Sequence, residues 1–89
     1  MSRKDRIAAV LTEALRPTRL DIVDESDRHA GHAGARPGGE THYRINIVSR
    51  AFAGKGRVER HRMINALLAA EFASGMHALA IAAAAPDPA

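Results

Sequence analysis

Histidine is the residue type with the widest chemical range in this chain of 89 residues, which has five histidines and no cysteine. Neutral imidazole binds transition metals, and in some iron–sulfur centres two imidazoles replace two of the usual thiolates. Without cysteine, the chain has no disulfide framework and cannot complete a thiolate cluster site by itself. If it binds a cluster, the remaining ligands must come from another molecule.

The histidines are distributed over a glycine-rich stretch at 25–39, a predicted strand, the start of a predicted helix and the start of a last strand; they are His29, His32, His42, His61 and His77. His61 precedes Ile64 by three residues, which predicts a packing or hydrogen-bonding role on the apolar stripe of its helix. His77 shares its strand parity with Leu79. It is therefore either a partly buried strand residue or, at the first position, a solvent-facing ligand.

A basic segment follows the second predicted strand. Residues 50–62 contain five cationic residues and only one acidic residue, Glu59. The cations are Arg50, Lys55, Arg57, Arg60 and Arg62. These side chains are candidates for phosphate contacts with DNA, although a solvated basic face is the plainer interpretation. The Gly-X-X-Gly clamp of KH domains is missing, because Gly54 and Gly56 have the wrong spacing. Stacking residues are also scarce, with one tyrosine, two phenylalanines and no tryptophan.

The elements that must position these side chains follow from hydrophobic periodicity. Ser2 and Asp5 predict a capped helix that ends before Pro17. Two strands follow, one around Leu20 and Ile22 and one with Tyr43, Ile45 and Ile47 on its buried face. A helix with the apolar stripe Ile64, Leu67, Leu68 and Phe72 is expected to end near Gly75.

The last strand is predicted over 77–83, with His77, Leu79 and Ile81 on one face and only alanine on the other. The alanine face is expected to let a helix backbone approach closely. The predicted order is α-β-β-α-β, with the second and third strands parallel if they are neighbours. A single domain spans 1–84, with a mobile loop at 25–39 and a disordered tail at 85–89.

Composition narrows the class of protein. A hydrophobic content of 46% argues against wholesale disorder. The first residues lead into an amphipathic pattern instead of an apolar run, which predicts a cytoplasmic protein without a secretory signal. The apolar run 78–86 is too short to span a bilayer. No nucleophile triad or phosphate-loop motif is present, so we expect neither an enzyme nor a small-molecule substrate.

Several short motifs stand in one order along the chain: Asp24-Glu25-Ser26, Glu40-Thr41-His42-Tyr43, Arg60-His61-Arg62 and His77-Ala78-Leu79. On these motifs the chain resembles the BolA family over roughly residues 7–82. The resemblance implies an α+β fold of the class II KH-like type. It has a three-stranded mixed sheet with helices packed on one face, and an extra helical turn can precede the second main helix.

The resemblance also implies a function. Proteins similar to this chain pair with monothiol glutaredoxins and share a bridging 2Fe–2S cluster, for iron sensing or cluster trafficking; the isolated protein holds no cofactor. The glutaredoxin supplies its cysteine and glutathione. The BolA-like partner supplies the histidine of the His-Ala-Leu motif, here His77, and a loop ligand that matches His29, with His32 as a close competitor.

Two further implications complete the sequence-based expectations. His61 and His42 are structural signature residues, with His42 as a reserve ligand beside the loop. The alternative function is a DNA-binding transcriptional regulator of stress response and cell morphology, which would use the basic segment 50–62.

Overall fold

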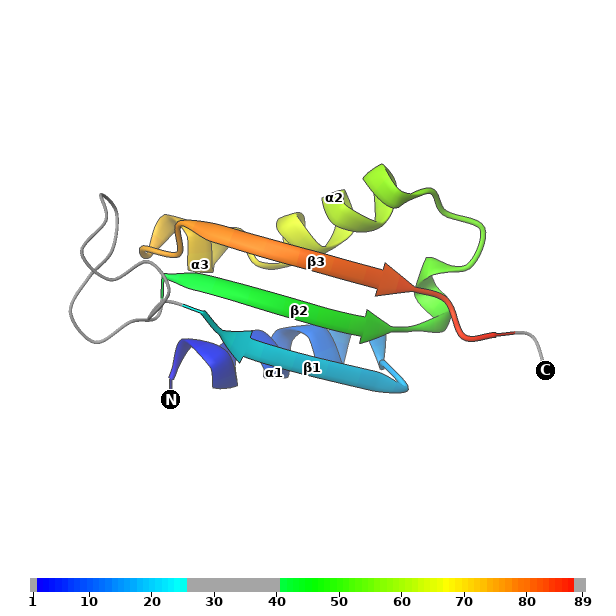
Figure 1. Cartoon of the computed structure of the whole chain (residues 1–89), viewed down its shortest axis with the longest axis horizontal. Coiled ribbons are helices and arrows are strands. Elements are labelled where there is room, and N and C mark those ends of the chain that lie inside the picture. Colours follow the sequence, from blue (N-terminus) through cyan, green and yellow to red (C-terminus); the bar gives the residue numbers. More distant parts are fainter. Residues whose placement is uncertain (1, 26–40, 88–89) are drawn as a thin grey trace.

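The computed structural model describes residues 2–25 and 41–87, and these form a three-stranded sheet with helices on one face (Figure 1). The elements in chain order are α1 (Arg3–Leu15), β1 (Arg19–Asp24), β2 (His42–Val48), the 3₁₀ turn η2 (Arg50–Phe52), α2 (Arg57–Leu67), α3 (Ala69–Ala73) and β3 (Ala78–Ala84). The α-β-β-α-β order and the extra helical turn predicted from the sequence are confirmed.

The sheet is mixed, with the strand order β1-β2-β3. β1 pairs with β2 in antiparallel register, so that Asp24 lies opposite Tyr43. β2 pairs with β3 in parallel register, so that His42 lies opposite Ala78. As a result, the end of β1 and the starts of β2 and β3 meet at the same end of the sheet.

Local sequence signals set both ends of α1. Ser2 Oγ accepts a hydrogen bond from the Asp5 amide at 3.1 Å, and the Asp5 carboxylate accepts one from the Ser2 amide at 3.4 Å, which completes a capping box. At the other end Arg16 adopts the left-handed conformation with φ 45°. The helix therefore ends before Pro17, as predicted from the restriction that proline places on the preceding residue.

The core lies between the helices and one face of the sheet. Ile45, Ile47, Phe52 and Ile64 are among its fully buried side chains. Tyr43 is also buried, as its strand parity predicts.

The expected approach of a helix to the alanine face of β3 is wrong. Ala78, Ala80, Ala82 and Ala84 are exposed, and the face that packs against the helices carries Leu79, Ile81 and Ala83. Larger apolar side chains remove more surface from water, so they take the core side even on an alanine-rich strand.

The single helix that was predicted to begin around Arg60 and to end near Gly75 is divided into α2 and α3. Leu68 leaves helical geometry with φ −101° and ψ 15°, and α3 begins directly after it. Leu68 is nevertheless buried and its amide donates to Ile64 O at 3.0 Å, so the break keeps the apolar stripe facing the core. Because α3 is only five residues long, its position depends on contacts with α1.

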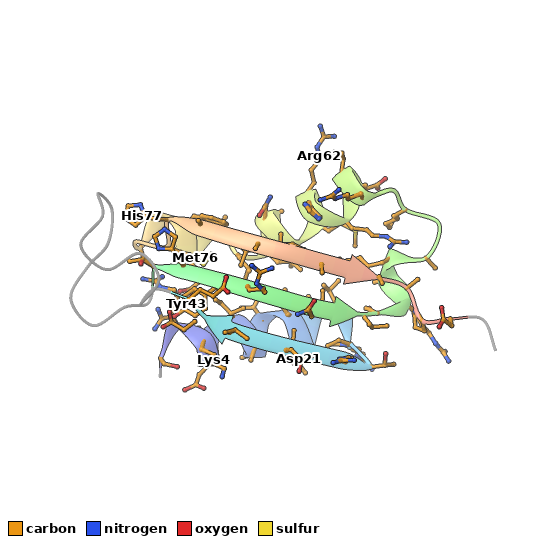
Figure 2. The ribbon with its side chains drawn as sticks, in the orientation of Figure 1. Lys4, Asp21, Tyr43, Arg62, Met76 and His77 are labelled. Atoms are coloured by element: carbon orange, nitrogen blue, oxygen red, sulfur yellow. The ribbon has the colours of Figure 1, made fainter. Side chains whose placement is uncertain are left out.

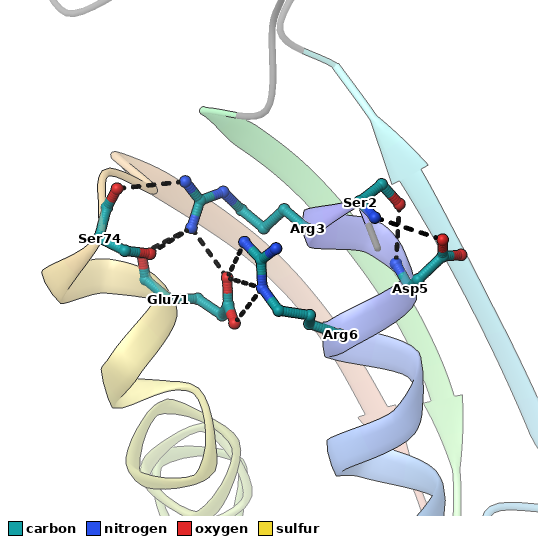
Figure 3. A network of polar contacts seen from close by, with 6 residues as sticks. All are labelled: Ser2, Arg3, Asp5, Arg6, Glu71 and Ser74. Atoms are coloured by element: carbon teal, nitrogen blue, oxygen red, sulfur yellow. Dashed lines mark hydrogen bonds and ion pairs between the residues drawn. The ribbon is translucent and has the colours of Figure 1, made fainter.

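A buried ion-pair cluster supplies those contacts (Figure 3). The Glu71 carboxylate accepts hydrogen bonds from Arg3 Nη1 at 2.8 Å and from Arg6 Nε and Nη2 at 3.0 Å each. Arg3 also donates to Ser74 Oγ at 2.7 Å. The hydrogen bonds from Arg6, followed by the charges of both arginines, lower the pKa of Glu71 from its ordinary value of 4.5, against the opposing effect of burial. The cluster fixes the helix that leads into His77.

Within residues 2–25 and 41–87 no helix is long and apolar enough to cross a membrane. Apart from Glu25, the loop predicted over 25–39 lies outside the described residues.

Candidate functional site

His77 lies immediately before β3, at the end of the sheet where β2 also begins (Figure 2). Its side chain is exposed, whereas the preceding residue, Met76, is buried. The backbone is held firmly, because the amides of His77 and Ala78 both donate to Thr41 O, at 2.7 and 3.2 Å. His77 is therefore exposed and not partly buried, and its role as a ligand stays a prediction.

His42 lies beside His77. The two imidazole rings are stacked, with centroids 6.1 Å apart and an angle of 17° between their planes. His42 Nδ1 is in turn hydrogen-bonded to the hydroxyl of the buried Thr41 at 2.9 Å. The sequence placed His42 near the loop as a signature residue; the parallel pairing of β2 with β3 is what brings its ring against His77.

The segment that carries the two loop histidines departs from this end of the sheet. Glu25 is tied to β2 by its amide, which donates to His42 O at 2.8 Å, and by its carboxylate, which accepts from Arg44 Nε at 3.3 Å. His29 and His32 themselves lie outside the described residues. Both anchors of the segment, Glu25 and Thr41, therefore lie at the same end of the sheet as His77.

The donor set at this end of the sheet is small. Among residues 2–25 and 41–87 there is no group of three or more histidine, cysteine, aspartate or glutamate side chains that could hold a metal ion. His77 and His42 supply two imidazoles and the chain has no thiolate. Within the described residues these two imidazoles do not make up a complete metal site, so any further ligand would have to come from elsewhere in the chain or from another molecule.

His61 lies far from this histidine pair. It is half-buried in the first turns of α2, and it lines a cleft of about 740 Å³ at the other end of β3. Besides His61, the cleft is lined by Arg19, Asn46, Ile47, Val48, Lys55, Arg57, Arg60, Ile81, Ala82, Ala83 and Ala84. The expected packing role is consistent with its half-buried position on α2.

The structure divides the predicted basic segment. Lys55, Arg57 and Arg60 line the cleft, whereas Arg50 and Arg62 do not. Arg62 points outward from α2, away from the sheet (Figure 2). Arg19 of β1, which is outside the predicted basic segment, also lines the cleft. The alternating polarity around Leu20 and Ile22 predicted a strand but gave no indication that Arg19 lies beside α2.

Sequence reasoning also missed the cluster around Glu71, although a signal for it exists. Glu71 lies seven residues after Ile64, and Arg3 lies four residues before Ile7, so each charged residue falls on the apolar stripe of its helix. Opposite charges on two such stripes indicate a buried ion pair between the helices. Thr41, whose carbonyl holds the backbone of His77, had no comparable signal.

Comparisons with known proteins agree with this architecture. The family described as BolA-like protein matches residues 11–88. An uncharacterised Sinorhizobium sp. protein from the cobS 5′ region is 51% identical over 87 residues, which cover 97% of this chain and 94% of that protein. Human BolA-like protein 1 is 44% identical over 80 residues, which cover 90% of this chain and 56% of the human protein.

A solved structure, the BolA domain of SufE1 from Arabidopsis thaliana, superimposes with a TM-score of 0.87 at 48% identity, covering 97% of this chain and 94% of that domain. The same chain spans only 24% of the full-length Arabidopsis SufE-like protein 1. The sequence match, the shared fold and the order of elements lead to one conclusion: this chain belongs to the BolA-like protein family.

Proposed function

We propose that this chain is a non-catalytic partner of a monothiol glutaredoxin and that the pair holds a bridging 2Fe–2S cluster for iron sensing or cluster trafficking. In this proposal His77 is one ligand and a loop histidine is the other, while the glutaredoxin cysteine and glutathione supply the thiolates. The observation that carries the proposal is the exposed imidazole of His77 on a backbone that Thr41 holds in place.

The surroundings of His77 suit a ligand that is presented to a partner. Both amides that fix its backbone donate to one carbonyl, that of the buried Thr41, so the ring is attached to the sheet and not to a free loop. The stacked ring of His42 limits the side-chain conformations open to His77. A ligand positioned in this way loses less conformational entropy when the partner docks.

The family resemblance favours His29 as the loop ligand, and chain length leaves both His29 and His32 open. His29 follows the anchored Glu25 by four residues, which keeps it within about 14 Å of that residue, whereas the seven residues to His32 allow about 25 Å. Glu25 and His77 flank the start of β2, and strands on either side of a central strand are about 10 Å apart. Both limits exceed this separation, so either histidine can reach His77 from Glu25.

The residues of this chain would bind and orient the cluster, and none transfers a proton to a substrate. Imidazole must be neutral to act as a ligand, so His77 would contribute a neutral nitrogen where a thiolate would contribute a negative charge. When bound, such a centre carries electrons at a potential that imidazole ligation raises. Exchange of thiolate for imidazole is the chemical difference that this partner would introduce.

The test is anaerobic co-purification with a monothiol glutaredoxin from the same cell, for the wild type and for His77→Ala. Visible absorption and circular dichroism report the ligands of the cluster. We expect a heterodimer whose spectrum differs from that of the glutaredoxin homodimer and a return to the homodimer spectrum with His77→Ala. His29→Ala and His32→Ala, measured in the same way, separate the two candidates for the loop ligand.

His61→Ala is the matched control, because it removes an imidazole near the opposite end of β3. Thermal unfolding of each variant without the partner identifies any loss of the fold itself. A heterodimer spectrum that is the same for wild type and His77→Ala would reject the assignment of His77, and the absence of any complex would reject the partnership.

A further inference from the structure

A second feature of the molecule lies outside the histidine pair. It is the cleft of about 740 Å³ lined by the first turns of α2, by Lys55 before that helix and by residues at the end of the three-stranded sheet near Ala84. We propose that this basic cleft is a binding site for a small phosphorylated ligand, a phosphomonoester or diphosphate with a compact body. The inference does not depend on the proposed glutaredoxin partnership.

The charge of the cleft is the first argument. Four cations line it, Arg19, Lys55, Arg57 and Arg60, and no carboxylate among the described residues does. Two of them have nearby partners: Arg19 Nε lies 2.9 Å from Asp21 and Lys55 Nζ lies 3.6 Å from Glu59. Arg57 and Arg60 have no carboxylate partner among the described residues, which leaves an excess of two positive charges at the cleft. A phosphomonoester near neutral pH carries a charge of about −1.5 to −2, which matches this excess.

The second argument is an unused donor. Arg60 Nη1 donates to Ala83 O at 3.1 Å, which holds the guanidinium against the end of β3. The Nε–H of the same side chain is buried and has no hydrogen-bond partner within the described part of the chain. A buried donor without an acceptor costs about 1–3 kcal/mol, so an acceptor supplied by a ligand would relieve this cost.

The third argument is the start of α2. Gly56 is its N-cap and provides no side-chain hydrogen bond to the first turn. A Cβ at Gly54 or Gly56 would meet no atom of the described residues within 4 Å, so no other side chain crowds the chain directly before α2. Unsatisfied amides at a helix start favour an anion. The two cation side chains Arg57 and Arg60 extend from the same first turn into the cleft.

The size of the cleft favours a small ligand over a nucleic acid. Small-molecule sites usually occupy about 300–1,000 Å³, and the cleft falls inside that range. Its apolar lining, from Ile47, Ile81 and the alanines at 82–84, offers contact to the body of a ligand. A DNA-binding face would be expected to use Arg50 and Arg62 as well, and these residues do not line the cleft.

The experiment is a titration of the ¹⁵N-labelled protein with sodium pyrophosphate at low salt, followed by amide shifts, for the wild type, Arg57→Gln and Arg62→Gln. Arg62 is the matched control, since it is an arginine of the same helix outside the cleft. We expect saturable shifts at residues 55–61 and 82–84. Loss of one charge-assisted hydrogen bond corresponds to roughly tenfold weaker binding for Arg57→Gln, with less than about twofold change for Arg62→Gln.

A second variant, Arg60→Lys, keeps the charge but removes the Nε–H, and we expect it to weaken pyrophosphate binding because the lysine ammonium cannot replace that donor. No saturable shift up to about 10 mM pyrophosphate would overturn the proposal. Equal weakening by Arg57→Gln and Arg62→Gln would do so too. The proposal would also be overturned if a short DNA duplex displaced pyrophosphate and its binding depended on both Arg50 and Arg62. That result would indicate an extended nucleic-acid-binding face in place of a small-ligand site.

The phosphate-binding proposal and the glutaredoxin proposal can each be rejected without affecting the other. The cleft and His77 are at opposite ends of β3, and a strand of seven residues spans about 20 Å. Arg57→Gln should therefore leave the spectrum of the glutaredoxin complex unchanged. His77→Ala should likewise leave pyrophosphate binding unchanged.

Discussion

Replacing Glu71 by glutamine removes the carboxylate that two arginines of α1 share, while the shape of the side chain stays almost the same. Arg3 is buried, with a side chain 9% exposed, and it loses a charge-assisted bond of 2.8 Å. Arg6 is 42% exposed and loses its pairing in a site that water can reach. The fold should therefore be destabilised mainly through Arg3.

The magnitude follows from what each arginine keeps. Removing one partner of a buried pair typically costs about 3–5 kcal/mol. Arg3 retains bonds to Ser74 Oγ at 2.7 Å and to the carbonyls of Glu71 and Ser74 at 3.0 and 3.3 Å. These bonds reduce the cost, and the exposed Arg6 adds only about 0–1 kcal/mol. We expect the free energy of unfolding to fall by about 2–3 kcal/mol. In a domain of this size such a loss lowers the midpoint of thermal unfolding by about 10–20 °C.

Chemical and thermal unfolding, monitored by far-ultraviolet circular dichroism, measures the effect. The matched control is Glu59→Gln, because Glu59 is 61% exposed and lies 3.6 Å from Lys55 on the surface of α2. That substitution should change the free energy of unfolding by less than about 0.5 kcal/mol. A Glu71→Gln variant as stable as Glu59→Gln would refute the claim that the cluster holds α3 in place.

The pH dependence gives an internal check. The pKa of Glu71 is lowered from 4.5, chiefly by the hydrogen bonds from Arg6. Because the folded-state pKa lies below the unfolded one, the stabilisation is fully present above pH 4.5 and is lost as the pH falls through the lowered value. The stability difference between wild type and Glu71→Gln should therefore narrow in acid, and a difference that widened there would contradict the assignment.

Three further predictions follow from individual contacts. Ser49→Ala should lower the free energy of unfolding by about 1–3 kcal/mol, because the buried Ser49 hydroxyl donates to Leu15 O and accepts from the Ala51 amide; urea titration measures this, and no change would exclude the role. Arg16→Gly should raise the same quantity by up to about 1 kcal/mol, because φ is 45° at this position, and a destabilised variant would argue against that backbone. If His77 is a ligand, cluster retention by the glutaredoxin complex should fall between about pH 8 and about pH 5.5; equal retention, read by visible absorption, would count against imidazole ligation.

Local signals in the sequence were enough for much of the fold. The capping box at Ser2, the stop before Pro17 and the alternation from Tyr43 to Ile47 each act within a few residues, so their outcome hardly depends on the rest of the chain. The two-helix division at Leu68 was not predictable in this way, because Leu68 continues the apolar stripe while its backbone leaves the helix. The prediction of which face of β3 packs against the helices was also wrong, because both faces of this alanine-rich strand carry apolar residues.

The sequence by itself determined the family, the order of elements and the residue types available for chemistry, because motifs, periodicity and composition are properties of neighbouring residues. Only the tertiary structure decided which of these residues meet. The parallel pairing of β2 with β3 stacks His42 on His77, and the crossover through α2 brings Arg57 and Arg60 to a cleft shared with Arg19. Such contacts join positions distant in the chain, and they depend on which strands pair and on how the helices pack over the sheet, which a pattern within one segment does not specify.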